Sequence, residues 1–315
     1  MKNITLHLLV NRQAGAGKGA DYYKEVTRHL NKEHITYQTY FTEYAGHEKE
    51  IIASLLPFTL KEWDSSIKNF PLLVVIGGDG TLHEVVNALV DYPNIPVGYL
   101  PGGSGNDFAR GIGMSRKIKH SLKQLLHATQ PSPINLMKAT EVHTKQSRLI
   151  LNNVGLGLDA KIVATANQSK AKHILNNLKL GSLAYISAAF SSVVKQPSYP
   201  LTISTETSGK TFEDAYLCTT TNHPYFGGGV AIDPTASPFT EDIHLIVVEK
   251  IPPMQLLWLV MQLFAKNHLN SKHVHRFIGP NLSVHCQTPQ EGQADGEVLG
   301  QHDFNLQFET TSRLF

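Results

Sequence analysis

The stretch LLVVIGGDGT, residues 72–81, decides the fold. It begins with an apolar run, residues 72–76, which is typical of a buried strand. A glycine turn follows, and residues 82–90 then show the pattern of a helix. A strand, a glycine turn and a helix in this order predict a βα unit. In such a unit the glycines let the backbone approach a phosphate, and the amino-terminus of the helix attracts it.

Two polar side chains of this turn are candidates for chemistry. Asp79 can hold Mg²⁺ or an ordered water, and Thr81 can cap the helix or donate to an oxygen. The alternative is a tight structural turn, in which Asp79 is only a carboxylate at the start of a helix.

Two further strands end in the same manner. Apolar runs at residues 6–10 and 97–100 are each followed by a glycine-bearing loop, at residues 14–19 and 102–105. Ligands of open α/β sheets bind at the carboxyl ends of the strands, so we expect the three loops to converge on one crevice. The sequence therefore predicts a phosphate site in an α/β domain whose sheet is mostly parallel.

The segment PGGSGNDFAR, residues 101–110, again places small residues before a polar cluster. Ser104 can donate to a phosphate oxygen, Asp107 can join a metal or water network, and Arg110 can pair with an anion. The alternative is an Asn-Asp turn that caps another helix.

The second half of the chain has a different pattern. Strand-like runs at residues 201–205, 215–221, 244–248 and 282–286 are separated by turn residues, which predicts a β-rich domain. Helical patterns at residues 171–194 and 254–269 interrupt it. The most apolar stretch, residues 254–264, is far shorter than the ~20 residues that a membrane-spanning helix needs.

Composition narrows the function. The chain of 315 residues is 41% hydrophobic and 17% charged, which is typical of a globular protein with two domains. A formal charge of +2 is too small to indicate nucleic acid as a partner. Cys218 and Cys286 lack metal or redox spacing and residues 1–10 lack a cleavage pattern, so we expect a cytoplasmic protein.

Together the two polar glycine loops resemble the catalytic-domain family of diacylglycerol kinases, which includes bacterial lipid kinases and is related to sphingosine and ceramide kinases. The resemblance extends over almost the whole chain, with further motifs at residues 11–18, 152–160, 181–185 and 226–229. Two positions depart from the pattern. Arg12 stands where proline is common, and residues 240–244 read TEDIH where the family often has Asp-Gly before a strand.

The resemblance implies an α/β amino-terminal nucleotide-binding domain of the NAD kinase and diacylglycerol kinase type, residues 1–130. It also implies a β-rich, β-sandwich-like carboxyl-terminal domain for the lipid substrate, residues 131–303, after which the chain returns to the first domain. The implied activity is that of an ATP-dependent lipid kinase, which transfers the γ-phosphoryl group to a lipid hydroxyl. Diacylglycerol, converted to phosphatidic acid, is the first choice of acceptor.

The resemblance also assigns roles to residues. Glu297, in the segment Asp295-Gly296-Glu297, corresponds to the catalytic base of the family, although a glutamate beside glycine in a turn is otherwise only solvated. Asp79 and Asp107 would organise Mg²⁺, directly or through water, and either Asp242 or Glu241 would supply a shifted ligand for a secondary metal site. The residues expected to bind ATP are Asn11, Thr42, Gly77, Gly78, Asp79, Gly80, Thr81, Gly103, Ser104 and Asn106. For Thr42, an ordinary surface threonine is the alternative.

The expected partners are a lipid substrate and the surface of a membrane, to which the protein would bind peripherally; a homodimer is compatible with this scheme. Leu217, Leu245 and Val247, together with parts of residues 175–190, would line an acyl-chain pocket. Four lysines near the first predicted helix of the second half can meet anionic headgroups or form a solvated face; they are Lys170, Lys172, Lys179 and Lys195.

Two other functions remain open at this stage. NAD kinases share the Gly-Gly-Asp-Gly-Thr loop, so a kinase that phosphorylates NAD is the nearest enzymatic alternative. A lipid-binding protein of the same fold without catalysis is the other, and the acidic residues Asp79, Asp107 and Glu297 argue against it.

Overall fold

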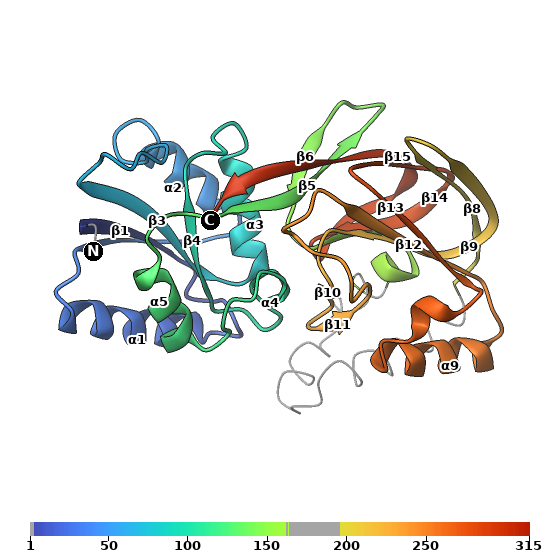
Figure 1. The fold of residues 1–315 in the computed structure, drawn as a ribbon, viewed down its shortest axis with the longest axis horizontal. Coiled ribbons are helices and arrows are strands. Elements are labelled where there is room, and N and C mark those ends of the chain that lie inside the picture. Colours follow the sequence, from blue (N-terminus) through green and yellow to red (C-terminus); the bar gives the residue numbers. More distant parts are fainter. Residues whose placement is uncertain (1–2, 162, 164–195) are drawn as a thin grey trace. The chain divides into compact units, whose positions relative to one another are not determined.

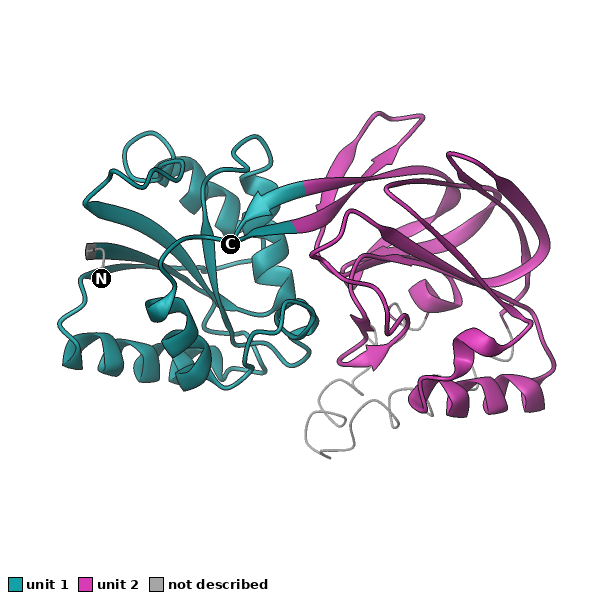
Figure 2. Ribbon diagram, viewed as in Figure 1, with its two compact units in different colours: residues 1–134, 312–315 teal, residues 135–311 magenta. Residues whose placement is uncertain are grey.

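Two units, each with its own hydrophobic core, account for residues 3–161, 163 and 196–315, the part of the chain that this computed structural model describes. Unit 1 comprises residues 1–134 and 312–315, and unit 2 comprises residues 135–311 (Figure 2). The domain boundaries predicted at residues 130 and 303 stay a prediction, because a compact unit is not the same as a domain that folds independently. The helix predicted at residues 171–194, the motif at 181–185 and the four lysines all lie outside the described residues.

Unit 1 is built on a parallel sheet in the order β2-β1-β3-β4 (Figure 1). Its strands are β1 (Asn3–Val10), β2 (Tyr37–Phe41), β3 (Asn69–Gly77) and β4 (Val97–Pro101). Its helices are α1 (Gly19–Lys32), α2 (His47–Leu55), α3 (Asp79–Ala88), α4 (Asp107–Gly111) and α5 (Ile118–His127). Helices α1 and α5 cover one face of the sheet, and α2 and α3 pack together on the other.

Burial on both faces explains why the strands of unit 1 are continuous apolar runs. Leu73, Val74, Val75 and Ile76 in β3 are all fully buried, although their side chains point alternately to opposite faces. The core under α1 and α5 joins Leu8 and Val74 of the sheet to residues of both helices.

Unit 2 contains a nine-stranded sheet in the order β13-β12-β9-β7-β14-β15-β5-β6, with β8 paired to both β14 and β9. The pairings whose register is known are antiparallel. Its strands are β5 (Pro133–Glu141), β6 (Ser147–Ile150), β7 (Asn153–Gly157), β8 (Tyr199–Thr205), β9 (Gly209–Thr221), β12 (Ile243–Glu249), β13 (Val274–Gly279), β14 (Asn281–Ala294) and β15 (Glu297–Leu314). A separate ribbon pairs β10 (Tyr225–Phe226) with β11 (Val230–Ala231). The α/β unit and the β-rich unit confirm the predicted fold class.

Strand β12 contains two of the residues predicted to line an acyl-chain pocket. Leu245 and Val247 are fully buried in the main core of unit 2. Ile246 and Val248 point to the opposite face, where Leu256 and Leu259 of α9 (Pro253–Phe264) cover them. Residues 175–190, the helical part of the predicted lining, lie outside the described residues, so the pocket stays a prediction.

Helix α9 is also shorter than residues 254–269, the span predicted for it. It ends at Phe264, and Lys266 then adopts a left-handed backbone with φ of 58°. The chain continues as the 3₁₀ turn η1 (His268–Asn270). Among the described residues, no helix has the length and apolarity needed to cross a bilayer.

The carboxyl-terminus completes unit 1. The buried guanidinium of Arg313 donates hydrogen bonds to the backbone oxygens of Leu89, Tyr92 and Ile95. Phe315 exchanges two backbone hydrogen bonds with Ser132, and its ring lies 5.0 Å from that of Phe108 in α4. The last residues of β15 therefore support the helix that follows the second glycine loop.

Candidate functional site

Three loops of unit 1 meet at the carboxyl ends of β1, β3 and β4, as the sequence predicts. The amide of Asn11 after β1 donates to the backbone oxygen of Ile76 in β3, at 3.0 Å. The amide of Gly102 after β4 donates to the backbone oxygen of Gly77, at 2.6 Å. Backbone hydrogen bonds thus hold the starts of the three loops side by side.

Glycines let the loops approach one another more closely than any side chain would permit. A Cβ atom added to Gly103 would lie 2.6 Å from Cα of Gly78, and one added to Gly15 would lie 2.4 Å from the backbone oxygen of Gly102. Gly15 also has a positive φ of 60°. The result is a backbone-lined surface at the edge of a parallel sheet, where phosphates of nucleotides commonly bind.

Asn106 shapes the second loop. Its backbone is left-handed, with φ of 53°, and its side chain is buried. Oδ1 accepts a hydrogen bond from the amide of Gly103 at 2.9 Å, and Nδ2 donates to the backbone oxygen of Gly103 at 2.8 Å. Because the oxygen and the nitrogen of the side-chain amide both bond to the backbone of Gly103, Asn106 fixes the position of Gly103.

Asp79 joins the first loop to the second. Its carboxylate accepts hydrogen bonds from the amides of Asp107 at 3.0 Å and Phe108 at 3.3 Å, at the start of α4. The two acceptors hold α4 against α3. Asp79 thus joins the loop after β3 to the helix that follows the loop after β4.

Asp107 begins α4, and its backbone amide donates to the carboxylate of Asp79 at 3.0 Å. The side chain of Asp107 is 5% exposed, and its Oδ1 lies 3.8 Å from Nε of Arg110. Burial raises the pKa of Tyr99 well above its ordinary value, and the negative charges of Asp79 and Asp107 raise it further. Two acidic residues thus stand at the starts of α3 and α4.

The remaining nucleotide-binding candidates differ in exposure. Thr81 is buried, and its Oγ1 accepts a hydrogen bond from Nδ2 of Asn11 at 3.0 Å. Thr42 is half-buried and its amide donates to Val10. Ser104 and Gly80 are exposed at the loop surface. Arg12 places its guanidinium 4.8 Å from the centre of the Phe41 ring.

Glu297 begins β15 directly after a tight turn of unit 2. Asp295 and Gly296 both have positive φ, 50° and 87°, which is the conformation of a two-residue hairpin turn. The carboxylate of Asp295 accepts hydrogen bonds from the amides of Leu151, Asn152 and Asn153 at 2.7 to 3.1 Å. These bonds fix the turn, while Glu297 itself is exposed.

The buried carboxyl group of Asp159, to which the sequence analysis gave no role of its own, supports this turn through hydrogen bonds. Oδ2 of Asp159 accepts hydrogen bonds from Asn153, Thr219 and Gln293 at 2.9 to 3.1 Å. Gln293 in turn accepts from the amide of Gly296 at 2.9 Å. Burial raises the pKa of Asp159 to about 6, although the three hydrogen bonds lower it in part.

A third network lies at Asp233, which is fully buried. Its Oδ2 lies 2.7 Å from Nδ1 of His244 and 2.6 Å from Nε of Arg276. Burial alone would raise the pKa of Asp233, but hydrogen bonds from His244 and Thr235 outweigh it and lower the pKa to about 2. Side chains thus balance this charge. Asp242, the residue proposed as a shifted metal ligand, is exposed and joins no cluster of three such ligands among the described residues.

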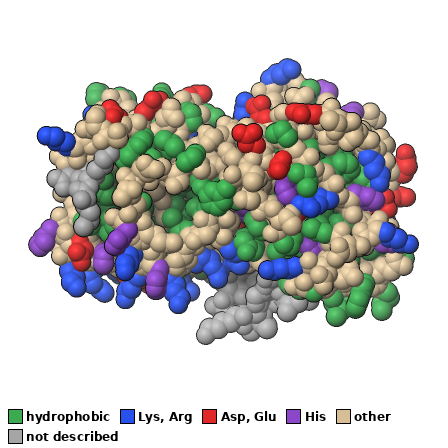
Figure 3. Space-filling view, in the orientation of Figure 1, with side chains coloured by type: hydrophobic (Ala, Val, Ile, Leu, Met, Phe, Trp, Pro, Cys, Tyr) green, Lys and Arg blue, Asp and Glu red, His purple; other side chains and the backbone are tan. Residues whose placement is uncertain are grey.

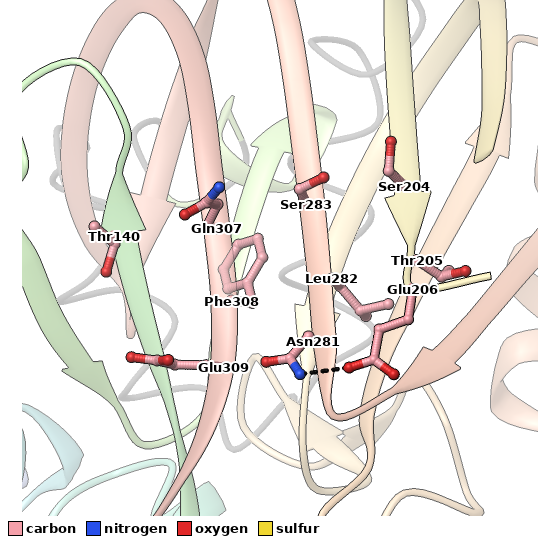
Figure 4. A pocket seen from close by; sticks show the side chains of 10 residues that line it. All are labelled: Thr140, Ser204, Thr205, Glu206, Asn281, Leu282, Ser283, Gln307, Phe308 and Glu309. Atoms are coloured by element: carbon pink, nitrogen blue, oxygen red, sulfur yellow. Dashed lines mark hydrogen bonds between the residues drawn. The ribbon is translucent and has the colours of Figure 1, made fainter. Parts of the chain in front are cut away.

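Two pockets formed by described residues lie away from these loops and turns. A pocket of about 360 Å³ lies at the opposite end of the β14–β15 hairpin from Asp295, and includes Ser283 and Gln307 (Figure 4). In unit 1, a pocket of about 900 Å³ lies at the amino ends of the strands, beside Ile4, Phe70 and Val97. Neither contains a candidate catalytic residue.

Comparison with known families follows this division of the chain. Residues 5–139 match the diacylglycerol kinase catalytic domain, and residues 152–311 match the YegS C-terminal NAD kinase beta sandwich-like domain. The chain belongs to the diacylglycerol kinase catalytic-domain family. This finding confirms the resemblance on which the residue roles were predicted.

Curated relatives of this family cover nearly the whole chain. A Bacillus subtilis (strain 168) protein named "Putative lipid kinase YtlR" is 28% identical over 95% of this chain and 94% of its own length. A second protein of that organism, named "Diacylglycerol kinase", is 25% identical, with 87% of each chain covered. The relatives are thus named as lipid kinases.

Solved structures share the fold. A crystal structure of "a putative diacylglycerol kinase from Bacillus anthracis str. Sterne" has a TM-score of 0.75 at 20% identity, covering 100% of this chain and 96% of that one. The yeast NADH kinase complexed with NADH has a TM-score of 0.52 at 11% identity, covering 99% and 81%.

Proposed function

We propose that this protein transfers the γ-phosphoryl group of ATP to the hydroxyl of a membrane lipid, and that diacylglycerol is the acceptor. One observation carries the proposal. In a member of the diacylglycerol kinase family, three glycine loops meet at one edge of a parallel sheet, and the carboxylate of Asp79 there binds the backbone amide of a second aspartate, Asp107. That arrangement supplies what phosphoryl transfer demands of a protein, namely positioning and neutralisation of charge.

The loops of unit 1 would bind the nucleotide. Close packing of Gly78 against Gly103 leaves room for phosphate oxygens to reach backbone amides, and Ser104 offers an exposed hydroxyl. Asn11, Thr42 and Thr81 would shape the same edge. Gly77 and Gly80 flank Asp79 in the first loop, and Asn106 holds Gly103 in place.

Asp79 and Asp107 fit a magnesium ion by their chemistry. Both offer carboxylate oxygens, which Mg²⁺ prefers, and one or two carboxylates suffice because the phosphates and waters complete its coordination. When bound, the ion would neutralise charge on the transferring phosphate. Asp79 would also hold the start of α4, since its oxygens accept the amides of Asp107 and Phe108.

Glu297 would act as the general base that accepts the proton of the lipid hydroxyl. Its position suits this role, because the carboxylate is exposed while the turn before it is fixed by the hydrogen bonds of Asp295. A well-placed general base contributes about 10² to 10⁴ in rate. Asp159 would act indirectly, by holding Gln293 and so the turn.

NAD kinase activity is the second candidate, because the fold is shared with the yeast NADH kinase. The names of the sequence relatives favour a lipid. A lipid kinase and an NAD kinase differ in the molecule that accepts the phosphoryl group. A lipid-binding protein without catalysis would need no paired carboxylates beside the phosphate loops.

A panel of acceptors tests the proposal. Purified protein receives γ-labelled ATP and Mg²⁺ with diacylglycerol, a sphingoid base, phosphatidylglycerol, a polyprenol or NAD. We expect label in phosphatidic acid. Label in NADP instead would establish the second candidate, and lipid binding with no labelled product under any metal would establish a non-catalytic protein.

A further inference from the structure

Helix α9 has an unusual composition for a helix on the surface of a globular protein. Its twelve residues, Pro253–Phe264, include no charged side chain. One face packs on unit 2, where Leu256 and Leu259 cover Ile246 and Val248 of β12. An ordinary surface helix would place charged and polar residues on the opposite face.

The opposite face of α9 is apolar as well. Five of its side chains are exposed at helical spacing: Met254 at 77%, Leu257 at 44%, Trp258 at 60%, Met261 at 58% and Phe264 at 38%. Figure 3 shows hydrophobic side chains gathered at the lower right, over α9. Single exposed hydrophobic residues are common on proteins, but a contiguous set on one helix marks a binding surface.

The charges that adjoin α9 in the sequence indicate what binds there. Residues 250–290 contain no aspartate or glutamate, whereas Lys250, Lys266, Lys272 and Arg276 lie in the same stretch. Lys266 and Lys272 are exposed, and neither forms an ion pair with a described residue. Basic side chains beside an apolar helix face complement an anionic lipid surface.

Length and residue type specify how the helix would bind. Twelve residues of α-helix extend about 18 Å, well below the ~30 Å of a bilayer core, so α9 can lie in the interface and cannot cross it. Trp258 stands in the middle of the exposed face, and tryptophan is enriched where membranes meet water.

We propose that the exposed face of α9 inserts into the surface of an anionic bilayer, with Lys266 and Lys272 against the headgroups. This inference deepens the proposed function and rests on it for its biological meaning, because a kinase of bilayer lipids must dock on its substrate. The physical claim concerns only binding of α9 to a membrane, and it can be tested without any kinase assay.

Fluorescence of Trp258 provides that test. The chain has two tryptophans, and Trp63→Phe leaves Trp258 alone. Vesicles of phosphatidylcholine and phosphatidylglycerol should shift its emission to the blue, and brominated acyl chains should quench it. Pure phosphatidylcholine should do so more weakly, and salt should weaken the effect. Emission that stays unchanged with anionic vesicles would overturn the proposal.

Vesicle sedimentation supplies the matched comparison. In Trp258→Gln with Met261→Gln, binding should fall roughly tenfold or more, because two half-exposed apolar side chains no longer enter the lipid. The control replaces Phe58 and Phe239 by glutamine, which are exposed at 89% and 60% on other segments, and should bind as the wild type does. Equal binding by the two variants would contradict the assignment to α9.

Two outcomes separate this inference from the proposed function. If the α9 variant changes the oligomeric state in light scattering while vesicle binding persists, the face binds a second copy and the membrane proposal fails. If Trp258 enters the bilayer but no lipid is phosphorylated, the docking face stands and the kinase proposal fails. Kinase activity on detergent-dispersed lipid should be unchanged in the α9 variant.

Discussion

Replacing Asp159 by asparagine should remove a pH dependence from the stability of unit 2. Asp159 is 2% exposed, and burial raises its pKa from the ordinary 3.8 to about 6. Because the folded pKa is raised, the folded state binds the proton more tightly than the unfolded chain does. The stability from this group is fully present below pH 3.8 and is lost as the pH rises through 6.

The size of the effect follows from the shift. A rise from 3.8 to about 6 is about 2 pKa units, and each unit corresponds to about 1.4 kcal/mol, which gives about 3 kcal/mol. Asparagine stays neutral, and its oxygen can still accept from Asn153, Thr219 and Gln293. Between pH 4 and pH 8 the free energy of unfolding of the wild type should therefore fall by about 3 kcal/mol relative to the variant.

Urea unfolding at several pH values, followed by the fluorescence of Trp258 in the Trp63→Phe background, measures this difference within unit 2. Any cost of the substitution that does not depend on pH cancels in the comparison. Titration of His223, whose pKa burial lowers to about 4, is common to both proteins and also cancels. Asp303→Asn, at an exposed position, is the control. Parallel pH profiles for wild type and Asp159→Asn would refute the reasoning.

Three further predictions concern unit 1. Asp79→Asn offers one oxygen to two backbone amides, so we expect a loss of about 2 kcal/mol in unfolding free energy and a shift of activity to higher Mg²⁺ concentration. Exposed Asp91→Asn is the control, and unchanged melting and Mg²⁺ curves would favour an inert turn. Gly103→Ala places a Cβ 2.6 Å from Cα of Gly78, which forces the two loops apart. Calorimetry should therefore show ATP binding at least about tenfold weaker, whereas wild-type affinity would argue that the loops can separate without loss of binding. Arg313→Met leaves three backbone oxygens without their donor and should destabilise unit 1 by about 3 kcal/mol in chemical unfolding. The exposed control Arg116→Met should not, and equal effects of the two substitutions would contradict the role given to Arg313.

Local signals in the sequence were sufficient to predict the parallel strands and glycine loops of unit 1. The apolar run at residues 72–76 lies within β3, and the glycines that follow it bring the loop to Gly103. Parallel strands with both faces covered read as continuous apolar runs, and glycine loops at their ends are visible without knowledge of the fold. The same reasoning placed the three loops at one edge of the sheet.

Side-chain networks could not be predicted, because their partners are distant in the sequence. Asp79 reaches amides 28 and 29 positions later, and Asp159 meets Gln293 after 134 positions. No motif marks Asp233 as the partner of Arg276. The Asp-Gly pair at residues 295–296 is an exception, since Asp-Gly is a hairpin-turn signal and the sequence already indicated a turn beside Glu297.

One error has a physical explanation. Helix α9 ends earlier than predicted because Lys266 takes a left-handed conformation, which glycine usually signals and lysine does not.

Transfer of label from γ-labelled ATP to diacylglycerol, compared between the wild type and Glu297→Gln, tests the central claim most directly. The substitution keeps the size of an exposed side chain and removes its basicity, so the fold should be unaffected. Glu309→Gln, another exposed glutamate of β15, is the control. We predict labelled phosphatidic acid from the wild type and the control, and a rate about 10² to 10⁴ lower from Glu297→Gln. Wild-type turnover in Glu297→Gln, or no labelled lipid from the wild type, would contradict the account.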